Sequence, residues 1–229
     1  MAKVFLSAGH GGSDPGAVGN GLKEKDINLQ TLLACKEVLE KHGVQVVASR
    51  TKDEDDRVGQ EVKEANASGA ELAVSFHVNA GGGDGFEAFY HTSSPKGKKL
   101  AQLGEKYVKA MGQNSRGIKS GNHLYFIKNT TMTSVLFESF FVDNAADKAI
   151  GDTLAEQKAF GVAYANAILE YLGIAKNATT TKPTETKKDT PTTNTIYRVQ
   201  VGAYGVKANA EAMQKKLKAA GFDAYITTK

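Results

Sequence analysis

Glu138 stands in the most apolar run of this sequence, between Val135-Leu136-Phe137 and Ser139-Phe140-Phe141. An unpaired carboxylate in such surroundings costs roughly several kcal/mol, so a side chain of this type needs a partner or a function. A structural ion pair would supply the partner, because buried carboxylates are usually paired. Proton transfer in catalysis would supply the function.

Two histidines and a second glutamate also lie at the ends of apolar runs. His10 follows Val4-Phe5-Leu6-Ser7, His77 lies in Ser75-Phe76-His77-Val78-Asn79, and Glu24 precedes a helical pattern. Two histidines and one carboxylate are an established ligand set for catalytic zinc, which keeps one position for water and brings its pKa to about 7. Glu138 would then take a proton from that water and deliver it to a leaving nitrogen. The residues therefore suggest a metal site with a free carboxylate beside it.

The loop Gly9-His10-Gly11-Gly12-Ser13-Asp14-Pro15-Gly16 leaves another type of site open, because glycine-rich loops after strands cradle phosphates. Neither the Gly-x-Gly-x-x-Gly spacing nor the Walker spacing is present. Asn79 lies two residues beyond His77 and shares its face of an extended strand. It is a candidate for binding a substrate amide, and a turn-forming role is the alternative.

The elements that must position these residues alternate along the first 175 residues. Apolar periodicity predicts strands at residues 3–7, 44–48, 71–77, 85–91, 123–127 and 134–140, and helices at residues 25–41, 56–68, 95–111 and 145–172. This alternation predicts an α/β layered domain with a largely parallel sheet. Ligands collect beyond the carboxyl ends of such strands, where we expect His10, His77 and Glu138 to converge.

Composition limits the remaining classes of protein. The length of 229 residues with 41% hydrophobic composition allows one domain of ordinary size and a second, smaller unit. The single cysteine, Cys35, excludes an internal disulfide framework and is expected to be a small core residue. No apolar run reaches the length of a membrane span, and the first residues lack the pattern of a secretory signal. We therefore expect synthesis in the cytoplasm without a signal peptide.

Charge and composition divide the chain into three parts. Residues 1–175 carry a net charge of −2 and form the expected catalytic domain. Residues 176–194 are rich in Thr, Lys and Pro, carry +2 and cannot form a core, so we expect a linker. Residues 195–229 carry +4. A basic tail of this kind suggests attraction to an anionic polymer, which could be nucleic acid, an acidic membrane or a bacterial wall.

The tail has the pattern of a small βαβ-like unit. Residues 196–201 alternate as a strand, residues 207–220 have helical spacing that Gly221 ends, and residues 223–227 form a second expected strand. About 35 residues bury little surface alone. We therefore expect this unit to pair with a copy, a partner chain or further residues.

Four segments resemble the zinc-dependent N-acetylmuramoyl-L-alanine amidases of the amidase 3 family. In the expected order over residues 1 to about 174, they are Gly9-His10-Gly11-Gly12, Gly21-Leu22-Lys23-Glu24-Lys25-Asp26 with Asn28-Leu29, Ser75-Phe76-His77-Val78-Asn79-Ala80, and Val135-Leu136-Phe137-Glu138 with Asp143-Asn144. The resemblance implies that His10, Glu24 and His77 bind one zinc ion and that Glu138 is the catalytic glutamate. It also implies a twisted six-stranded sheet flanked by helices. The bond cleaved would join N-acetylmuramic acid to the first L-alanine of the peptidoglycan stem peptide.

The tail is similar to half of a SPOR-type peptidoglycan-binding repeat, through Tyr197-Arg198-Val199-Gln200-Val201-Gly202-Ala203-Tyr204, Asn209-Ala210-Glu211 and Ala220-Gly221-Phe222. Such tails accompany sporulation-associated and prophage-borne wall lytic enzymes. A complete module of that type usually has two halves. The resemblance thus implies wall binding by a half-module that self-associates between chains.

The expected partners are peptidoglycan and, through the basic tail, anionic wall polymers, with no nucleic acid and no membrane span. The expected place of action is the bacterial cell wall after release from the cell. Three functions remain: a zinc amidase, a zinc peptidase that cuts within or between stem peptides, and a non-catalytic wall-binding protein. The presence of all four site residues argues against the third.

Overall fold

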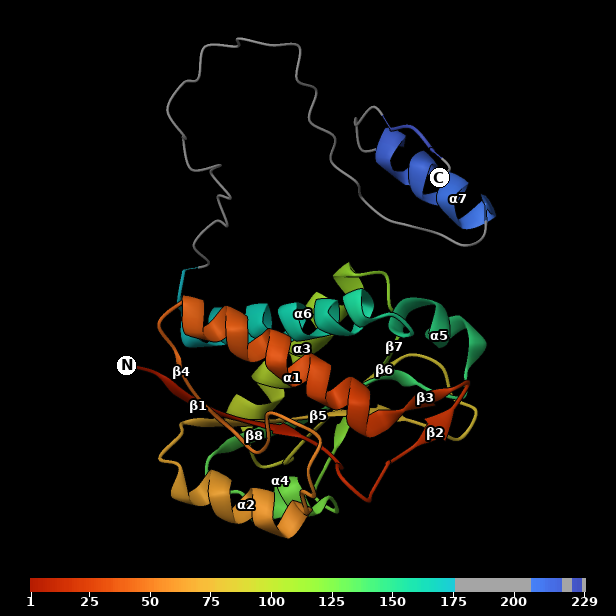
Figure 1. The fold of residues 1–229 in the computed structure, drawn as a ribbon. Coiled ribbons are helices and arrows are strands. Elements are labelled where there is room, and N and C mark those ends of the chain that lie inside the picture. Colours follow the sequence, from red (N-terminus) through yellow and green to blue (C-terminus); the bar gives the residue numbers. More distant parts are fainter. Residues whose placement is uncertain (176–206, 220–223, 228–229) are drawn as a thin grey trace. The chain divides into compact units, whose positions relative to one another are not determined.

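The computed structural model describes residues 1–175, 207–219 and 224–227, and the chain divides into two compact units at Thr180 and Thr181 (Figure 1). The first unit contains β1 (Lys3–Ala8), β2 (Val18–Gly19), β3 (Leu22–Lys23), α1 (Glu24–Lys41), β4 (Gln45–Ala48), α2 (Val58–Ala67), β5 (Leu72–Asn79), β6 (Phe86–Tyr90), α3 (Pro95–Ala110), β7 (Ser115–Ser120), α4 (Tyr125–Asn129), β8 (Thr133–Phe141), α5 (Ala145–Gly151) and α6 (Leu154–Leu172). The second unit contains α7 (Lys207–Ala219).

Six strands of the first unit form one sheet in the order β4-β1-β5-β8-β6-β7. Every neighbouring pair is parallel except β6 and β8, which run antiparallel. The expected α/β fold with a mostly parallel six-stranded sheet is therefore confirmed. The strands β1, β5 and β8 end at one edge of this sheet, as the sequence pattern predicts.

Helices cover both faces of the sheet, with α1, α3 and α6 on one face and α2 and α4 on the other (Figure 1). The larger core lies under α1, α3 and α6, where the ring of Tyr164 stacks on Phe137 and Phe76 at centroid distances of 4.5 and 5.4 Å. Cys35 is buried in the same core, as expected, and burial raises the pKa of its thiol. A smaller core around Phe5, Phe126 and Leu136 fills the other face.

The expected strand at residues 123–127 is wrong, because this segment leads into the short helix α4. A short apolar run such as Leu124-Tyr125-Phe126-Ile127 has no clear period, and here Phe126 and Ile127 are buried from a helix. The sixth strand is β7 at Ser115–Ser120, an edge strand with one large apolar residue, Ile118. Its pattern is weak because only one of its sides is paired.

The single helix expected at residues 145–172 is two helices, α5 and α6. Thr153 begins the second helix with a capping box: its hydroxyl accepts the Glu156 N–H at 3.2 Å, and the Glu156 carboxylate accepts the Thr153 N–H at 3.0 Å. This reciprocal pair satisfies two backbone donors and sets a helix start inside a continuous periodic pattern.

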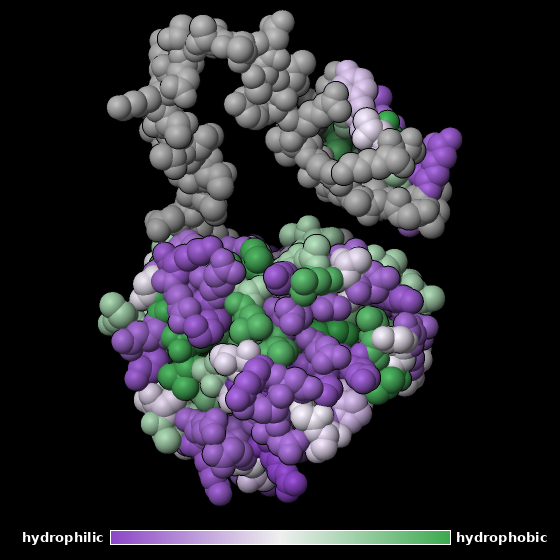
Figure 2. Space-filling model, viewed as in Figure 1, coloured by the Kyte–Doolittle hydropathy of each residue, from purple (hydrophilic) through white to green (hydrophobic). Residues whose placement is uncertain are grey.

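In the tail, the expected helix is present as α7. The strand expected at residues 196–201 lies outside the described residues, and residues 224–227 have no strand assignment. Within the described parts of the chain, no helix is long and apolar enough to cross a membrane. In the view of Figure 2, the first unit is mostly hydrophilic, with small hydrophobic areas between the charged side chains.

Candidate metal centre and active site

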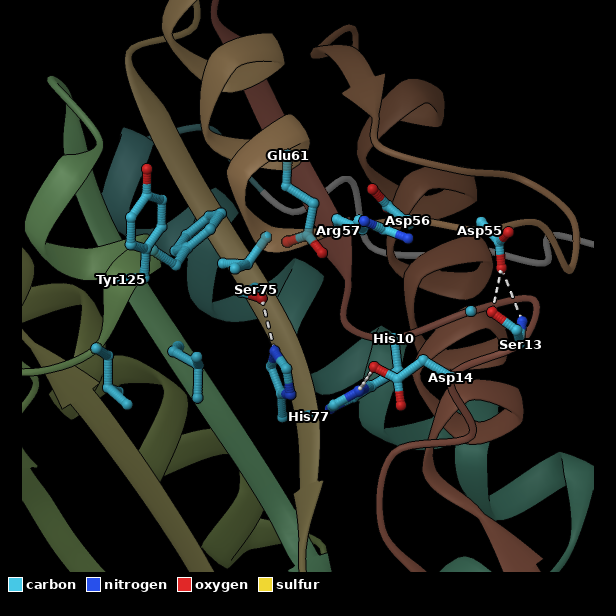
Figure 3. Close-up of a pocket in the computed structure, with 15 residues that line it drawn as sticks. His10, Ser13, Asp14, Asp55, Asp56, Arg57, Glu61, Ser75, His77 and Tyr125 are labelled. Atoms are coloured by element: carbon cyan, nitrogen blue, oxygen red, sulfur yellow. Dashed lines mark hydrogen bonds and ion pairs between the residues drawn. The ribbon is translucent and has the colours of Figure 1, made fainter.

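Three side chains predicted as metal ligands meet at the edge where β1 and β5 end. The carboxylate of Glu24, the first residue of α1, lies between the two imidazoles, with Oε1 2.9 Å from His77 Nδ1 and Oε2 3.4 Å from His10 Nε2. One ligand atom from each residue lies within 4.8 Å of the others. Figure 3 shows His10 and His77 side by side at the floor of a pocket. This group fits a divalent cation.

The backbone of the glycine-rich loop makes this close approach achievable. His10 has a φ of 66°, in the left-handed region that non-glycine residues rarely adopt outside functional sites. A Cβ on Gly9 would lie 2.1 Å from His77 Cε1, and a Cβ on Gly16 would lie 2.6 Å from Glu24 Oε2. Glycine at these two positions therefore leaves the space that the ligands occupy.

Glu24 is buried, and its neighbours hold it ionised. Burial opposes the charge, but the His77 and His10 side chains together with the Ala17 N–H lower the pKa of Glu24 below its ordinary value. Burial likewise opposes protonation of His77, but the hydrogen bond that His77 Nδ1 donates to Glu24, together with the Glu24 charge, reverses this effect and raises the pKa of His77. An ionised carboxylate between two imidazoles is a donor set that a divalent metal ion prefers.

The outward-facing ring nitrogens of both histidines are also held. His10 Nδ1 lies 2.8 Å from Asp14 Oδ2, and His77 Nε2 lies 3.1 Å from Ser75 Oγ. Ser75 Oγ donates to Ser7 Oγ at 3.4 Å, and Ser7 Oγ donates to the carboxylate of Glu61. The hydroxyl groups donate in sequence toward Glu61, so Nε2 of His77 donates to Ser75 Oγ. Nδ1, which faces Glu24, is therefore the ring nitrogen of His77 that could bind a metal after losing its proton.

These supporting residues are absent from the sequence-based prediction. A contact between Ser75 and His77 could have been predicted from the sequence, because Ser75 lies two residues before His77 and therefore shares its face of the strand. The roles of Ser7 and Glu61 could not have been predicted in this way, because only the pairing of β1 with β5 and the packing of α2 bring them next to Ser75.

Glu138 lies beside His77, because the two residues pair in register across β5 and β8. Phe137 points into the larger core, so Glu138 points to the opposite face, which His77 shares. Its Oε2 is buried and has no hydrogen-bond partner among the described residues. Burial raises the pKa of Glu138 to about 7, with the charges of Glu24 and Glu87 adding to the shift and that of His77 opposing it. A carboxyl group with this pKa can both accept and donate a proton near neutral pH.

Asn79, the candidate for binding a substrate amide, lies at the end of β5. Its Nδ2 donates to Glu87 Oε2 at 3.4 Å, and its Oδ1 accepts the Ala80 N–H at 2.8 Å. The residue therefore belongs to the neighbouring polar group on β6, and its role toward a substrate stays a prediction.

Carboxylates of Asp14 and of the neighbouring segment 53–55 occupy backbone donors of the glycine-rich loop, which argues against a phosphate cradle. Gly12 N–H donates to Asp53 at 2.8 Å, Ser13 N–H to Asp55 at 2.7 Å, and Gly16 N–H to Asp14 at 3.0 Å. Backbone donors that already bind negative side chains are not free to bind an anion.

A pocket of about 530 Å³ opens next to the ligand group, between α2 and α4 (Figure 3). Its lining includes His10 and His77, four carboxylate residues and one cation, Arg57, with Tyr125 and Leu136 supplying apolar surface. The four carboxylates belong to Asp14, Asp55, Asp56 and Glu61. This pocket is large enough for a ligand of several rings or residues and is predominantly acidic.

Asp56 in this pocket makes the stability of the fold depend on pH. Its Oδ2 is buried and unpartnered among the described residues, and burial raises the pKa of Asp56 from 3.8 to about 6, with Glu61 and Glu64 adding to the shift. Because the pKa of Asp56 is higher in the folded state, Asp56 does not lower the free energy of unfolding below about pH 4. It lowers the free energy of unfolding progressively as the pH rises through about 6. Replacing Asp56→Asn removes that loss, so the free energy of unfolding should increase by about 1 kcal/mol at pH 8, discounted for partial exposure, and change little at pH 4. Urea unfolding at both pH values measures this; an equal change at both would contradict it.

Comparison with known proteins covers both units of the chain. The family model for N-acetylmuramoyl-L-alanine amidase (Amidase_3) matches residues 4–170, which contain every residue of the candidate site. The SPOR domain model matches residues 162–228, which include the end of α6 as well as α7.

Individual relatives agree with these matches. N-acetylmuramoyl-L-alanine amidase CwlM of Bacillus licheniformis is 34% identical over 230 residues, covering 99% of this chain and 85% of that protein. The sporulation-specific N-acetylmuramoyl-L-alanine amidase of Bacillus subtilis strain 168 is 32% identical over 233 residues, covering 100% of this chain and 86% of that protein. The solved catalytic domain of CwlV, an N-acetylmuramoyl-L-alanine amidase from Bacillus (Paenibacillus) polymyxa var. colistinus, has a TM-score of 0.71 at 34% identity and covers 76% of this chain and 100% of that one.

Proposed function

Because this chain belongs to the amidase 3 family of N-acetylmuramoyl-L-alanine amidases and hydrolyses peptidoglycan, we propose that His10, Glu24 and His77 hold one zinc ion and that Glu138 moves the protons. The observation that carries this assignment is the unpartnered Oε2 of Glu138 beside a ligand group of two imidazoles and one carboxylate. Zinc bound there supplies a Lewis acid that polarises the amide carbonyl and brings the pKa of water to about 7.

Residues of the chain itself carry out the proton transfers and orient the ligands. Glu138 takes a proton from the attacking water at Oε2, holds it while the C–N bond breaks, and delivers it to the nitrogen of the departing L-alanine. Its position one strand spacing from His77, about 4.8 Å, places this carboxyl group next to the ligand group. Asp14 and Ser75 hold the two imidazoles in the tautomers that a metal needs.

The other parts of the chain would bring the enzyme to its polymer. We infer that residues 1–175 form the catalytic domain, residues 176–194 a linker, and residues 195–229 a wall-binding half-module that pairs between chains. The SPOR match supports peptidoglycan binding by the tail. Its net charge of +4 supports a further attraction to anionic wall polymers.

The direct test is digestion of purified peptidoglycan, followed by identification of the newly exposed groups. We expect each cut to free the amine of an L-alanine and to produce no new reducing sugar ends. New amines on other residues would instead favour the zinc peptidase that cuts within stem peptides. Wall binding without any new amine would mark a non-catalytic wall-binding protein.

The hydrogen-bonded serines give a second test of the metal assignment. Replacing Ser75→Ala leaves Nε2 of His77 without its acceptor, so the dissociation constant for Zn²⁺ should rise by about tenfold. Competition with a chromophoric chelator measures this in the full chain. Ser139→Ala is the matched control, because Ser139 is a buried serine of the same sheet whose hydroxyl lies 2.8 Å from Tyr164 in the core. Equal zinc affinity in Ser75→Ala and the parent protein would remove the serine from the metal site.

A further inference from the structure

One row of polar side chains crosses the sheet next to the ligand group. His77 pairs in register with Glu138, and Glu138 pairs with Glu87 on the antiparallel strand β6. Phe86 packs against Phe137 in the larger core, so Glu87 points to the opposite face, as Glu138 does. The row therefore runs from the metal ligands toward the edge strand β7.

Glu87 gathers two cations at the end of this row. Its carboxylate is buried and accepts hydrogen bonds from Arg116 Nε at 2.5 Å, from Lys119 Nζ and, at 3.4 Å, from Asn79 Nδ2. Burial opposes its charge, but Lys119 and Arg116 lower the pKa of Glu87. One carboxylate neutralises only one of two cations, so this group keeps one positive charge in excess.

The two cationic side chains are accessible to solvent, and one of them is held in position by an aromatic ring. The Arg116 and Lys119 side chains are 44% and 37% exposed, whereas Glu87 is 6% exposed. The Arg116 guanidinium lies over the Phe141 ring at 5.3 Å, which limits its movement. Two nearby carboxylates make their hydrogen bonds elsewhere: Asp143 accepts the N–H groups of Gly81 and Gly82 at 2.8 and 2.9 Å, and Asp84 accepts from Asn114. Among the described residues, neither forms an ion pair with Arg116 or Lys119.

The pocket beside the ligand group carries the opposite charge. The 530 Å³ pocket is lined by Asp14, Asp55, Asp56 and Glu61 against the single cation Arg57. A ligand that spans the metal site therefore meets an acidic surface at one end and a basic group at the other. An anionic chain is repelled by the first and attracted by the second.

We propose that Arg116 and Lys119 bind a carboxylate of the stem peptide, so that the peptide leaves the scissile amide toward β7 and the glycan lies toward the acidic pocket. This proposal rests on the proposed function, which supplies the substrate. The muramoyl side carries no charge at the cut, because its carboxyl group forms the scissile amide. The stem peptide is the side of the bond that carries free carboxylates.

The spacing of the sheet indicates which carboxylate is bound. From Glu138 on β8 to β7 is two strand spacings, or about 10 Å. An extended peptide advances about 3.4 Å per residue, so this distance reaches the second or third residue beyond the cut. Arg116 and Lys119 are thus specificity-determining residues for a carboxylate at those positions.

Soluble muramoyl peptides provide the test. The full chain is assayed with Zn²⁺ on two substrates that differ only in whether the carboxylates of the second and third stem residues are free or amidated. We expect KM to be about tenfold lower for the free carboxylates with kcat nearly equal, as for a charge-assisted hydrogen bond made in both ground and transition states. Equal KM values would overturn the proposal and leave the amidase function intact. No cleavage of either substrate would contradict the proposed function itself.

A single variant then assigns the preference to these side chains. Lys119→Gln removes the excess positive charge and leaves Arg116 paired with the buried Glu87, so the fold should be retained. The ratio of KM values for the amidated and free-carboxylate substrates should fall to about twofold or less. Lys106→Gln is the matched control, because Lys106 pairs with Glu170 on the surface between α3 and α6. A preference that survives in Lys119→Gln, or that Lys106→Gln removes equally, would overturn the proposal.

Discussion

Replacing Glu138→Gln will reduce the rate of peptidoglycan hydrolysis by about a thousandfold, within the range for loss of a general acid-base group. Glutamine keeps the size and polarity of the side chain but cannot take a proton from water or return one to the leaving nitrogen. The pKa of about 7 at Glu138 is suited to both steps, and its unpartnered Oε2 is free to carry the proton. Release of L-alanine amines from purified peptidoglycan measures the effect.

The fold and the metal site should survive this substitution. Removing a buried charge without a partner leaves the thermal midpoint equal or higher, because the desolvation cost of the carboxylate disappears. Zinc affinity should stay within about threefold, since Glu138 is not one of the three proposed ligands. Glu71→Gln, an exposed glutamate just before β5, is the control and should retain full activity. Activity above about a tenth of the parent's in Glu138→Gln would assign the proton transfer to another group.

Removal of the metal should abolish hydrolysis, and Zn²⁺ should restore it. Glu24 and both histidines have their donor atoms within 4.8 Å, and no other group of three or more His, Cys, Asp or Glu in the described residues is placed to hold a metal. The chelator-treated chain should lose activity to background, and about one equivalent of Zn²⁺ should restore it. Digestion before and after dialysis, with metal content measured in parallel, tests this.

Replacing His77→Ala separates the metal from other effects of a chelator. This variant should bind zinc at least about a hundredfold more weakly and should not be restored by the amount that restores the parent. His123→Ala is a suitable control, because His123 is exposed and its ring contacts Phe89, away from the ligand group. Hydrolysis that survives complete metal removal would refute the assignment of His10, Glu24 and His77.

The sequence predicts the ligand group because its residues occupy the ends of strong apolar runs. In a parallel sheet such ends share one edge. The convergence of His10 and His77 can therefore be predicted without knowing which strands are neighbours. Glu138 is recognisable for the opposite reason: a carboxylate inside an apolar strand requires an explanation. Both arguments depend only on local pattern and on the cost of burial.

The surroundings of the site depend on pairing and register, which local pattern does not contain. The sequence gives no reason to place Glu87 near the site, which becomes apparent only when β6 is found antiparallel beside Glu138. Ser7 and Glu61 become relevant only when β1 and α2 pack beside β5. Arg116 and Lys119 lie on β7, which the apolar pattern misses because none of the residues of this edge strand is fully buried, so it needs few large apolar side chains.

The position of β8 also has a consequence for synthesis. This strand is the last of the six to be synthesised, yet it lies inside the sheet between β5 and β6, where it joins β4, β1 and β5 to β6 and β7. A nascent chain that has emerged only as far as residue 132 therefore lacks the strand that joins the two parts of the sheet, and it lacks Glu138, the proposed proton-transfer residue. Because long-range strand pairing is slow and cannot precede its last strand, the ability to cut the wall would arise abruptly, late in translation, when β8 inserts between β5 and β6.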